Sequence, residues 1–302
     1  MKFINEKILK SIQEDYNKGL NDKYRSLFYR KEKGIRAPYI KYAHTSEELY
    51  QYALCVNEIF YFIETYCKVR DVVDGEIKTI NLYGYQTKTL DDLIENRFFI
   101  LLWSRQTGKT LIMSLFILYN ILFTKKNVVI IANKSHSGIE LLEKIRELYR
   151  RLPFFLKPGV VTNTQRRIDF DNGSKIIITC SPEACLSFNV DILFLDEFAY
   201  LAPKFKTSVL NSYIPSVSSI KDSHIVVAST PNGFDKFYDM VQGAYEKTNN
   251  FKVSKAYWYD VPGKDKEWKD NMISNFGEES FNNEYELKFK GKQLPGKYYM
   301  DF

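Results

Sequence analysis

FFILLWSRQTGKT, residues 98–110, decides the fold of this chain. Its first six residues, 98–103, are all apolar, which is typical of a β-strand buried on both faces. A polar loop follows at residues 104–110. Residues 111–123 are then apolar nearly all round and too long for a strand, so we expect a buried helix there. The sequence therefore predicts a strand, a polar loop and a helix in succession.

The loop ends in Gly108-Lys109-Thr110, where the helix begins. In a strand, loop and helix of this kind, loop N–H groups and the helix N-terminus converge on a phosphate. Lys109 would reach the β- and γ-phosphates, and the Thr110 hydroxyl would take a Mg²⁺ position. The full pattern G-x-x-x-x-G-K-[ST] is not met, because Trp103 occupies its first glycine position. An ordinary loop with a capping threonine is therefore the alternative.

Further apolar runs extend the pattern on the C-terminal side. NVVIIA at residues 127–132, ILFL at 192–195 and IVVA at 225–228 are expected to be buried strands. Residues 138–152 carry apolar side chains at steps of three and four, as on one face of a helix, and Asn172-Gly173 indicates a hairpin turn. Strands alternating with helices predict βαβ units and a largely parallel sheet.

Two acids, Asp196 and Glu197, directly follow the run ILFL. They would lie at the carboxyl edge of the sheet, where ligand sites of open α/β sheets are found. Asp196 would hold Mg²⁺, and Glu197 would orient and deprotonate a water molecule. A strand that ends in a solvated acidic turn is the alternative. Together with Lys109, the pair predicts Mg²⁺-dependent nucleotide hydrolysis.

A third motif follows the last apolar run. Small hydroxyl side chains at the end of a strand can respond to a γ-phosphate or a water molecule by hydrogen bonding, and Pro-Asn-Gly makes a stiff turn. By itself the motif is also explained by an ordinary turn, which is the alternative. Its residues are Ser229, Thr230, Pro231, Asn232 and Gly233.

Composition excludes several other classes of protein. The chain has 302 residues and a formal charge of +6, and its 45% apolar and 26% charged content is that of a globular protein. Its four cysteines form no C-x-x-C pair and there are only three histidines, so a zinc site is not expected. No secretory signal opens the chain, and no uninterrupted apolar run approaches the ~20 residues of a bilayer span. We expect a soluble cytoplasmic protein with no membrane partner.

These motifs, in this order, resemble the large terminase subunits of tailed bacteriophages. The Walker A loop of that family typically lacks the first glycine and carries Arg-Gln before Gly-Lys-Thr, as Arg105-Gln106 does here. Tyr85-Gln86 resembles the family's adenine-recognition motif, and residues 171–174 resemble its hairpin before the Walker B strand. The resemblance runs from about residue 80 to residue 291.

The resemblance implies an α/β fold, a P-loop NTPase of the additional-strand (ASCE, RecA-like) class. Its mainly parallel central sheet would be flanked by helices, with a smaller helical lid subdomain. The implied function is Mg²⁺-dependent ATP hydrolysis that powers translocation of double-stranded DNA into a procapsid, in the host bacterial cytoplasm. The implied partners are DNA, a portal protein and a small terminase subunit. A homo-oligomeric ring is implied for the working motor, although the isolated domain could be a monomer.

The resemblance also implies roles for single residues. Glu197, Lys109 and Arg105 would be catalytic, with Arg105 beside the γ-phosphate. Thr110 and Asp196 would hold Mg²⁺, and residues 229–233 would couple hydrolysis to subdomain movement. The residues implied to contact ATP are Tyr85, Gln86, Ser104, Arg105, Gln106, Thr107, Gly108, Lys109 and Thr110.

The sequence departs from the family at one functional position. Where the family carries an Arg-Gly pair, a candidate trans-acting arginine finger, this chain has Leu186 and Ser187. A finger would then come from elsewhere, for example Arg146, Arg150 or Arg151. Alternatively, Arg105 would serve in cis, or the chain would hydrolyse ATP weakly.

The expected organisation is an ATPase core at residues 60–242 and a lid made of residues 1–59 and 243–290. Residues 291–302 would be a linker. The family's nuclease domain is not expected, because only 16 residues follow Glu286 and Asp301 is the only acid among them.

Lysines and aromatic residues alternate in 251–269, and residues 30–36 are basic. Such segments can follow a nucleic-acid backbone, or the rings can form a small core with solvated lysines. Two further functions stay open: a helicase-like nucleic-acid translocase, and a nucleotide-binding assembly module with little turnover.

Overall fold

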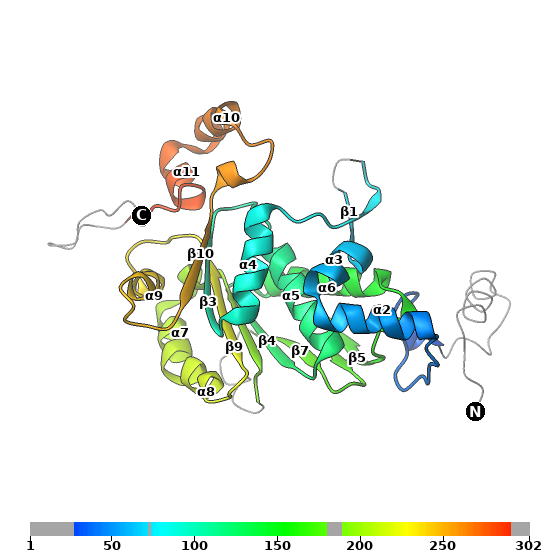
Figure 1. Ribbon diagram of the computed structural model, residues 1–302. Helices are drawn as coiled ribbons and strands as arrows, with labels where there is room; N and C mark the ends of the chain where they lie inside the picture. Colours follow the sequence, from blue (N-terminus) through cyan, green and yellow to red (C-terminus); the bar gives the residue numbers. More distant parts are fainter. Residues whose placement is uncertain (1–26, 72–73, 180–188, 291–302) are drawn as a thin grey trace.

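The computed structural model describes residues 27–71, 74–179 and 189–290 (Figure 1). The predictions for Leu186 and Ser187, for residues 1–26 and for the linker at 291–302 fall outside these ranges. In the described ranges, no helix has both the length and the apolar character needed to cross a membrane.

The α-helices are α2 (Ser46–Asn57), α3 (Ile59–Tyr66), α4 (Gly84–Glu95), α5 (Lys109–Phe123), α6 (Ser135–Arg151), α7 (Pro203–Ser208), α8 (Ile214–Ser218), α9 (Lys236–Tyr245), α10 (Lys266–Phe276) and α11 (Glu278–Glu284). The shorter helical segments are η2 (Tyr29–Lys31), η3 (Phe154–Leu156), η5 (Phe198–Tyr200), η6 (Val209–Tyr213) and η7 (Trp258–Asp260). The strands are β1 (Lys68–Arg70), β2 (Ile77–Thr79), β3 (Phe98–Trp103), β4 (Asn127–Ala132), β5 (Val160–Thr164), β6 (Arg167–Phe170), β7 (Lys175–Thr179), β8 (Ile192–Asp196), β9 (His224–Ser229) and β10 (Lys252–Ala256).

One eight-stranded sheet forms the centre of the molecule, in the order β10-β3-β9-β8-β4-β7-β6-β5. All pairs from β10 to β7 are parallel, whereas β6 pairs antiparallel with β7 and β5. The predicted hairpin at Asn172-Gly173 is the turn between β6 and β7. Because β3, β9, β8 and β4 are adjacent and parallel, their carboxyl ends meet at one edge of the sheet. The prediction of a mainly parallel sheet is confirmed.

Helices cover both faces of this sheet, which explains why its strands are apolar throughout. In β3, Phe99, Leu101 and Trp103 belong to the core beneath α3, α4, α5 and α6. Ile100 and Leu102 belong to a second core, whose helical residues come from η5, η6, α8 and α9. Figure 1 shows these layers, with α4, α5 and α6 on one side and α7, α8 and α9 on the other.

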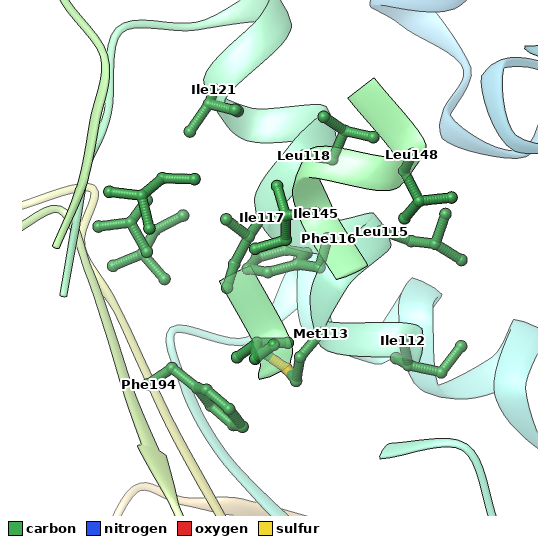
Figure 2. Packing of buried hydrophobic residues seen from close by; sticks show 14 of the residues in the cluster. Ile112, Met113, Leu115, Phe116, Ile117, Leu118, Ile121, Ile145, Leu148 and Phe194 are labelled. Atoms are coloured by element: carbon green, nitrogen blue, oxygen red, sulfur yellow. The ribbon is translucent and has the colours of Figure 1, made fainter. Parts of the chain in front are cut away.

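Helix α5 is the most deeply buried helix of the first core. Residues 112–118 are each at most 2% exposed. Figure 2 shows their side chains packed against Ile145 and Leu148 of α6 and Phe194 of β8. Such close packing leaves little freedom to shift a helix. The first turn of α5, with Lys109 and Thr110, is therefore held rigidly against the sheet.

The structure differs from the predicted division of the chain at two places. Ile35, Cys55 and Ile59 lie in the first core, so this part of residues 27–59 packs against the core that also holds α5. Strand β10 pairs with β3, so residues 252–256 belong to the central sheet. Cys55 of α2 and Ile59, Phe62 and Ile63 of α3 are buried in the first core. The Phe62 ring packs against the rings of Tyr119 and Phe123 of α5.

Residues 258–286 form a small helical unit beyond the carboxyl edge of the sheet, here called the α10–α11 unit (Figure 1). It has its own core, in which Trp258, Phe281 and Tyr285 are buried and Trp268 packs against them. Trp258 and Trp268 stack with ring centroids 5.5 Å apart, and the Lys264 ammonium lies 4.6 Å from the centre of the Trp268 ring. These rings form a small core, which favours the alternative that they pack together over the interpretation that they follow a nucleic-acid backbone.

Candidate nucleotide-binding site

The loop at residues 104–110 is shaped by two residues with left-handed backbone. Gln106 has a φ of 61° and Gly108 a φ of 91°. The Thr107 hydroxyl donates to the Ser104 carbonyl oxygen at 2.7 Å, and the Ser104 N–H donates to the Ala256 carbonyl oxygen of β10 at 2.8 Å. The loop is thus fixed at both its base and its bend.

Tyr85 and Gln86, the predicted adenine contacts, lie behind this loop. The Tyr85 hydroxyl and the Gln86 side-chain amide both donate to the Thr107 carbonyl oxygen, at 2.7 Å and 3.1 Å. A Cβ at Gly108 would lie only 2.6 Å from Gln86 Nε2, so this position has no room for a side chain. The structure therefore uses these two residues to support the loop and does not bring them into the cavity described next.

A cavity of about 480 Å³ opens where the loop meets the carboxyl ends of β3, β9, β8 and β4. Its volume lies within the ~300–1,000 Å³ of typical small-molecule sites. The lining residues are Arg105, Gln106, Thr107, Gly108, Lys109, Thr110, Asn133, Lys134, Asp196, Glu197, Tyr200, Ser229, Thr230 and Glu284. Among the predicted ATP and metal contacts, Ser104, Tyr85 and Gln86 do not line it.

Lys109 is the cation at the closed end of the loop. Its ammonium donates to the carbonyl oxygens of Trp103 at 2.7 Å and Ser104 at 3.3 Å. Burial lowers the pKa of Lys109 to about 8, although nearby carboxylates, Asp196 foremost, favour the charged form. An ammonium held in this way is preorganised for an anion.

Asp196 and Glu197 differ in their surroundings although they are neighbours. Burial and then the charge of Glu197 raise the pKa of Asp196 to about 6, while Lys109 acts in the opposite direction. Glu197 is exposed and has left-handed backbone, with a φ of 50°. This conformation costs a residue with a side chain about 1–2 kcal/mol, and such strain is concentrated at functional sites.

Thr110 and Asp196, the predicted metal ligands, both line this cavity with side-chain oxygens that could hold a metal ion. Mg²⁺ is usually bound by one or two carboxylates together with substrate phosphates and waters. One hydroxyl and one carboxylate beside a phosphate-binding loop fit that donor set. Across the described residues there is no cluster of three or more His, Cys, Asp or Glu side chains that could enclose a metal.

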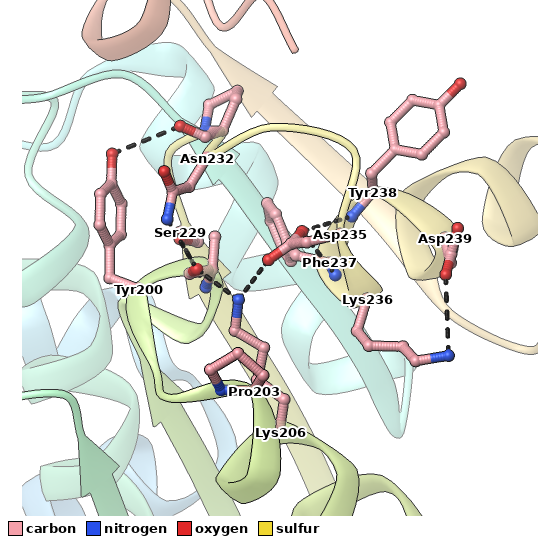
Figure 3. A network of polar contacts seen from close by, with 12 residues as sticks. Tyr200, Pro203, Lys206, Ser229, Asn232, Asp235, Lys236, Phe237, Tyr238 and Asp239 are labelled. Atoms are coloured by element: carbon pink, nitrogen blue, oxygen red, sulfur yellow. Dashed lines mark hydrogen bonds and ion pairs between the residues drawn. The ribbon is translucent and has the colours of Figure 1, made fainter. Parts of the chain in front are cut away.

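The Ser-Thr-Pro-Asn-Gly motif contacts the segment that follows Asp196 and Glu197 (Figure 3). The Ala199 N–H donates to the Ser229 hydroxyl at 3.1 Å, and the Asn232 amide donates to the Ala199 carbonyl oxygen at 3.1 Å. The Tyr200 hydroxyl lies 3.2 Å from the Thr230 hydroxyl. Ser229 and Thr230 line the cavity, whereas Pro231, Asn232 and Gly233 continue away from it. These hydrogen bonds join the end of β9 to the segment that follows β8.

Comparison with known families agrees with this geometry. A family model described as "Terminase large subunit, T4likevirus-type, N-terminal" matches residues 100–297, well over half of the chain. The chain belongs to the large terminase subunit family.

Solved terminase structures share the fold. The ATPase domain of the large terminase of Thermus phage P74-26 is 19% identical, with a TM-score of 0.59 over 70% of this chain and 94% of that chain. The large terminase of bacteriophage HK97 is 13% identical, with a TM-score of 0.59 over 78% of this chain and 55% of that chain. At these identities the likeness concerns the fold, and it confirms the predicted additional-strand P-loop class.

A buried ion pair extends the polar network of this terminase domain to α9 (Figure 3). The Lys206 ammonium donates to the Asp235 carboxylate and to the Ala199 carbonyl oxygen. Asp235 in turn accepts from the N–H groups of Phe237 at 3.0 Å and Tyr238 at 3.3 Å, at the start of α9. The segment after Asp196 is thereby tied both to the Ser-Thr-Pro-Asn-Gly motif and to α9.

The arginines considered for a trans-acting finger differ in their availability. The Arg146 side chain is 3% exposed, and it donates to Asn163 Oδ1 at 2.9 Å and to the Thr164 carbonyl oxygen. A finger has to reach a neighbouring subunit, so the structure gives Arg146 an internal role. Arg150 and Arg151 are more exposed, in ion pairs on the surface of α6. Arg105 is 63% exposed on the cavity itself.

Four cavity residues were missed by sequence reasoning: Asn133, Lys134, Tyr200 and Glu284. Asn133 and Lys134 directly follow β4, and the rule that ligand sites lie at carboxyl ends of parallel strands could have found them. Glu284 has no such signal, since it comes from the polar α11, outside the sheet.

Proposed function

We propose that this chain is the motor ATPase of viral DNA packaging. In this proposal, Mg²⁺-dependent ATP hydrolysis powers translocation of double-stranded DNA into a procapsid, in the cytoplasm of the bacterial host. Membership of the terminase family supports the proposal. One observation carries it: Lys109, Thr110, Asp196 and Glu197 line a single cavity at the carboxyl edge of the sheet.

The proposed roles follow from the surroundings of each residue. At pH 7, below its pKa of about 8, Lys109 is mostly protonated and would bind the phosphates. Thr110 and Asp196 would hold Mg²⁺, which supplies charge neutralisation of the phosphates when bound. Glu197 would orient a water molecule and accept its proton. Arg105 would stabilise charge on the transferred phosphoryl group in cis.

Tyr85 and Gln86 would act mainly by holding the loop through the Thr107 carbonyl oxygen. The contacts of both residues with that carbonyl support this role. Direct contact with adenine stays a prediction.

Coupling would run through Ser229, Thr230, Pro231, Asn232 and Gly233. The bonds between this motif and Ala199 support that role, because they join the ends of β9 and β8. We place the ATPase core at residues 60–242 together with β10, and the lid in the α10–α11 unit. DNA, the portal protein, the small terminase subunit and a homo-oligomeric ring are the proposed partners.

The test is Glu197→Gln, with Glu246→Gln, at an exposed position just after α9 and outside the cavity lining, as the matched control. Loss of the proton acceptor should reduce ATP turnover by about 10²–10⁴-fold and leave ATP affinity within a few fold. The control should behave as the wild type. Turnover of Glu197→Gln within threefold of the wild type would remove Glu197 as the catalytic base.

The same assay separates the alternative functions. Tight ATP binding by the wild type without turnover, even with duplex DNA and portal protein, would favour a nucleotide-binding assembly module. Turnover stimulated fully by free nucleic acid, with no effect of the portal protein, would favour a helicase-like translocase.

A further inference from the structure

Glu284 brings a third carboxylate into the phosphate end of the cavity, besides Asp196 and Glu197. It is the last residue of α11, and its side chain is 22% exposed. It therefore belongs to the α10–α11 unit and not to the sheet. A third carboxylate repels bound phosphates, so its presence among the donors of a nucleotide-binding site calls for an explanation.

Glu284 contacts three of the segments around the cavity, at Arg105, Tyr200 and Thr230. Its Oε1 accepts from the Tyr200 hydroxyl at 3.3 Å and lies 3.8 Å from Arg105 Nη1. Its Oε2 accepts from the Thr230 hydroxyl at 3.3 Å. The Arg105 N–H donates to the Glu284 carbonyl oxygen at 2.9 Å. The Glu284 carboxylate thus pairs with the Arg105 cation of the P-loop and accepts from the Thr230 hydroxyl at the end of β9.

These partners are the kind of groups that a terminal phosphate needs. Arg105 supplies a cation and N–H donors, and the Thr230 hydroxyl supplies a donor in the same cavity. A carboxylate and a phosphate oxygen are both anionic acceptors, so they compete for the same donors. Glu284 also favours the charged form of Lys109 and so raises the pKa of that ammonium.

We propose that Glu284 competes with the terminal phosphate of a bound nucleoside triphosphate for Arg105 and Thr230, and so sets the preference between tri- and diphosphate. The inference rests on the proposed function of the cavity as an ATP site. A diphosphate carries no third phosphate and leaves these contacts intact. A triphosphate displaces the Glu284 carboxylate, and α11 is displaced with it.

A second contact also joins the α10–α11 unit to the loop at residues 104–110. The Lys264 ammonium donates to the Gln106 carbonyl oxygen at 3.4 Å, while it lies over the ring of Trp268 in the core of the unit. The unit therefore meets the P-loop at Gln106 and at Arg105. Displacement of Glu284 changes the contact at Arg105. The unit then reorients about the remaining contact at Gln106.

The experiment compares Glu284→Gln with Glu286→Gln in the full chain by isothermal titration calorimetry with Mg²⁺-ATP-γ-S and Mg²⁺-ADP. Both substitutions remove one charge, and the two side chains are similarly exposed, at 22% and 19%. Glu286 instead accepts from Trp258 Nε1 at 3.2 Å and from Lys269 at 2.8 Å, away from the cavity. It is therefore a matched control for net charge.

We expect Glu284→Gln to bind ATP-γ-S about tenfold more tightly, with ADP affinity changed less than twofold. The ratio of the two affinities should stay at the wild-type value in Glu286→Gln. An equal change for both nucleotides, or weaker ATP-γ-S binding, would overturn the inference. Wild type that binds neither nucleotide would instead refute the ATP site itself.

Hydrogen exchange of the wild type gives a second measurement that does not depend on a variant. Backbone N–H groups of residues 278–286 should exchange faster with ATP-γ-S bound than with ADP bound, because α11 loses its contacts to Arg105 and Thr230. Equal exchange in the two complexes contradicts the displacement of Glu284, even if both nucleotides bind.

Discussion

Replacement of Lys206 by methionine tests whether the network behind the cavity is held by one buried charge. Lys206 donates to the carboxylate of Asp235 and to the carbonyl oxygen of Ala199. Its side chain is 7% exposed and that of Asp235 is 22% exposed. Methionine keeps the apolar stem and removes only the ammonium, so the packing of the stem is largely preserved.

The magnitude follows from what the substitution leaves behind. Removing one partner of a buried ion pair typically costs about 3–5 kcal/mol, because the other charge stays buried and unpaired. Asp235 keeps its two hydrogen bonds to the first turn of α9 and part of its contact with water. We therefore expect a loss near the lower end of that range, about 3 kcal/mol.

The assay is urea unfolding followed by far-ultraviolet circular dichroism, with stability taken from the transition midpoint at a common slope. The matched control is Lys236→Met, which breaks an ion pair with Asp239 at 3.9 Å between side chains that are 57% and 55% exposed. Exposed pairs contribute about 0–1 kcal/mol. The control should therefore stay within about 0.5 kcal/mol of the wild type.

A double-mutant cycle supplies the decisive comparison. In Lys206→Met/Asp235→Asn the unpaired carboxylate is gone and asparagine still caps α9, so the loss should be about 2 kcal/mol smaller than the sum of the single losses. A Lys206→Met loss below about 1 kcal/mol, or additive losses in the cycle, would refute the reasoning that the pair acts as a buried one.

Two further predictions concern Gly108 in the phosphate-binding loop and the buried ammonium of Lys157. Gly108→Ala should lose roughly 2–4 kcal/mol of stability, because φ is 91° and the new Cβ would press on the buried Gln86 amide. The control is Gly84→Ala, where nothing lies within 4 Å of an added Cβ. Equal urea midpoints for the two variants would contradict this account. Burial and then the charge of Arg36 lower the pKa of Lys157 to about 7, so between pH 7 and 10 the unfolded chain binds more protons and stability rises with pH. Urea unfolding at several pH values should show the wild type gaining up to about 1.4 kcal/mol per pH unit over Lys157→Met; a constant difference would contradict the shifted pKa.

Local sequence was sufficient wherever the chemistry depends on neighbouring residues. The apolar run before Ser104, the Gly108-Lys109-Thr110 triplet and the two acids after ILFL each define an element and its end within a few positions. Parallel strands then bring their carboxyl ends to one edge, so the cavity could be placed before its geometry was known. The same rule places Asn133 at this edge, because it directly follows the strand at residues 127–132.

Contacts between elements that are distant along the chain could not be predicted in the same way. The segment containing Ile35 and Cys55 is largely polar, and its Leu49 and Tyr50 are exposed, yet Ile35 and Cys55 are buried in the first core. Residues 252–256 are polar enough to suggest a lid, but β10 lies at the edge of the sheet, where one more strand pairs with β3. Burial of a few side chains and pairing at an edge depend on a partner that is distant along the chain.

The sequence by itself determined the phosphate-binding loop, the acidic pair and the class of sheet that carries them, because each depends on a short run of residues and on the regular geometry of strands and helices. Only the tertiary structure decided that Gln86 supports the loop from behind, that Arg146 is enclosed, and that Glu284 enters the cavity. Those three outcomes depend on which side chains meet after packing, and packing joins segments that share no local pattern.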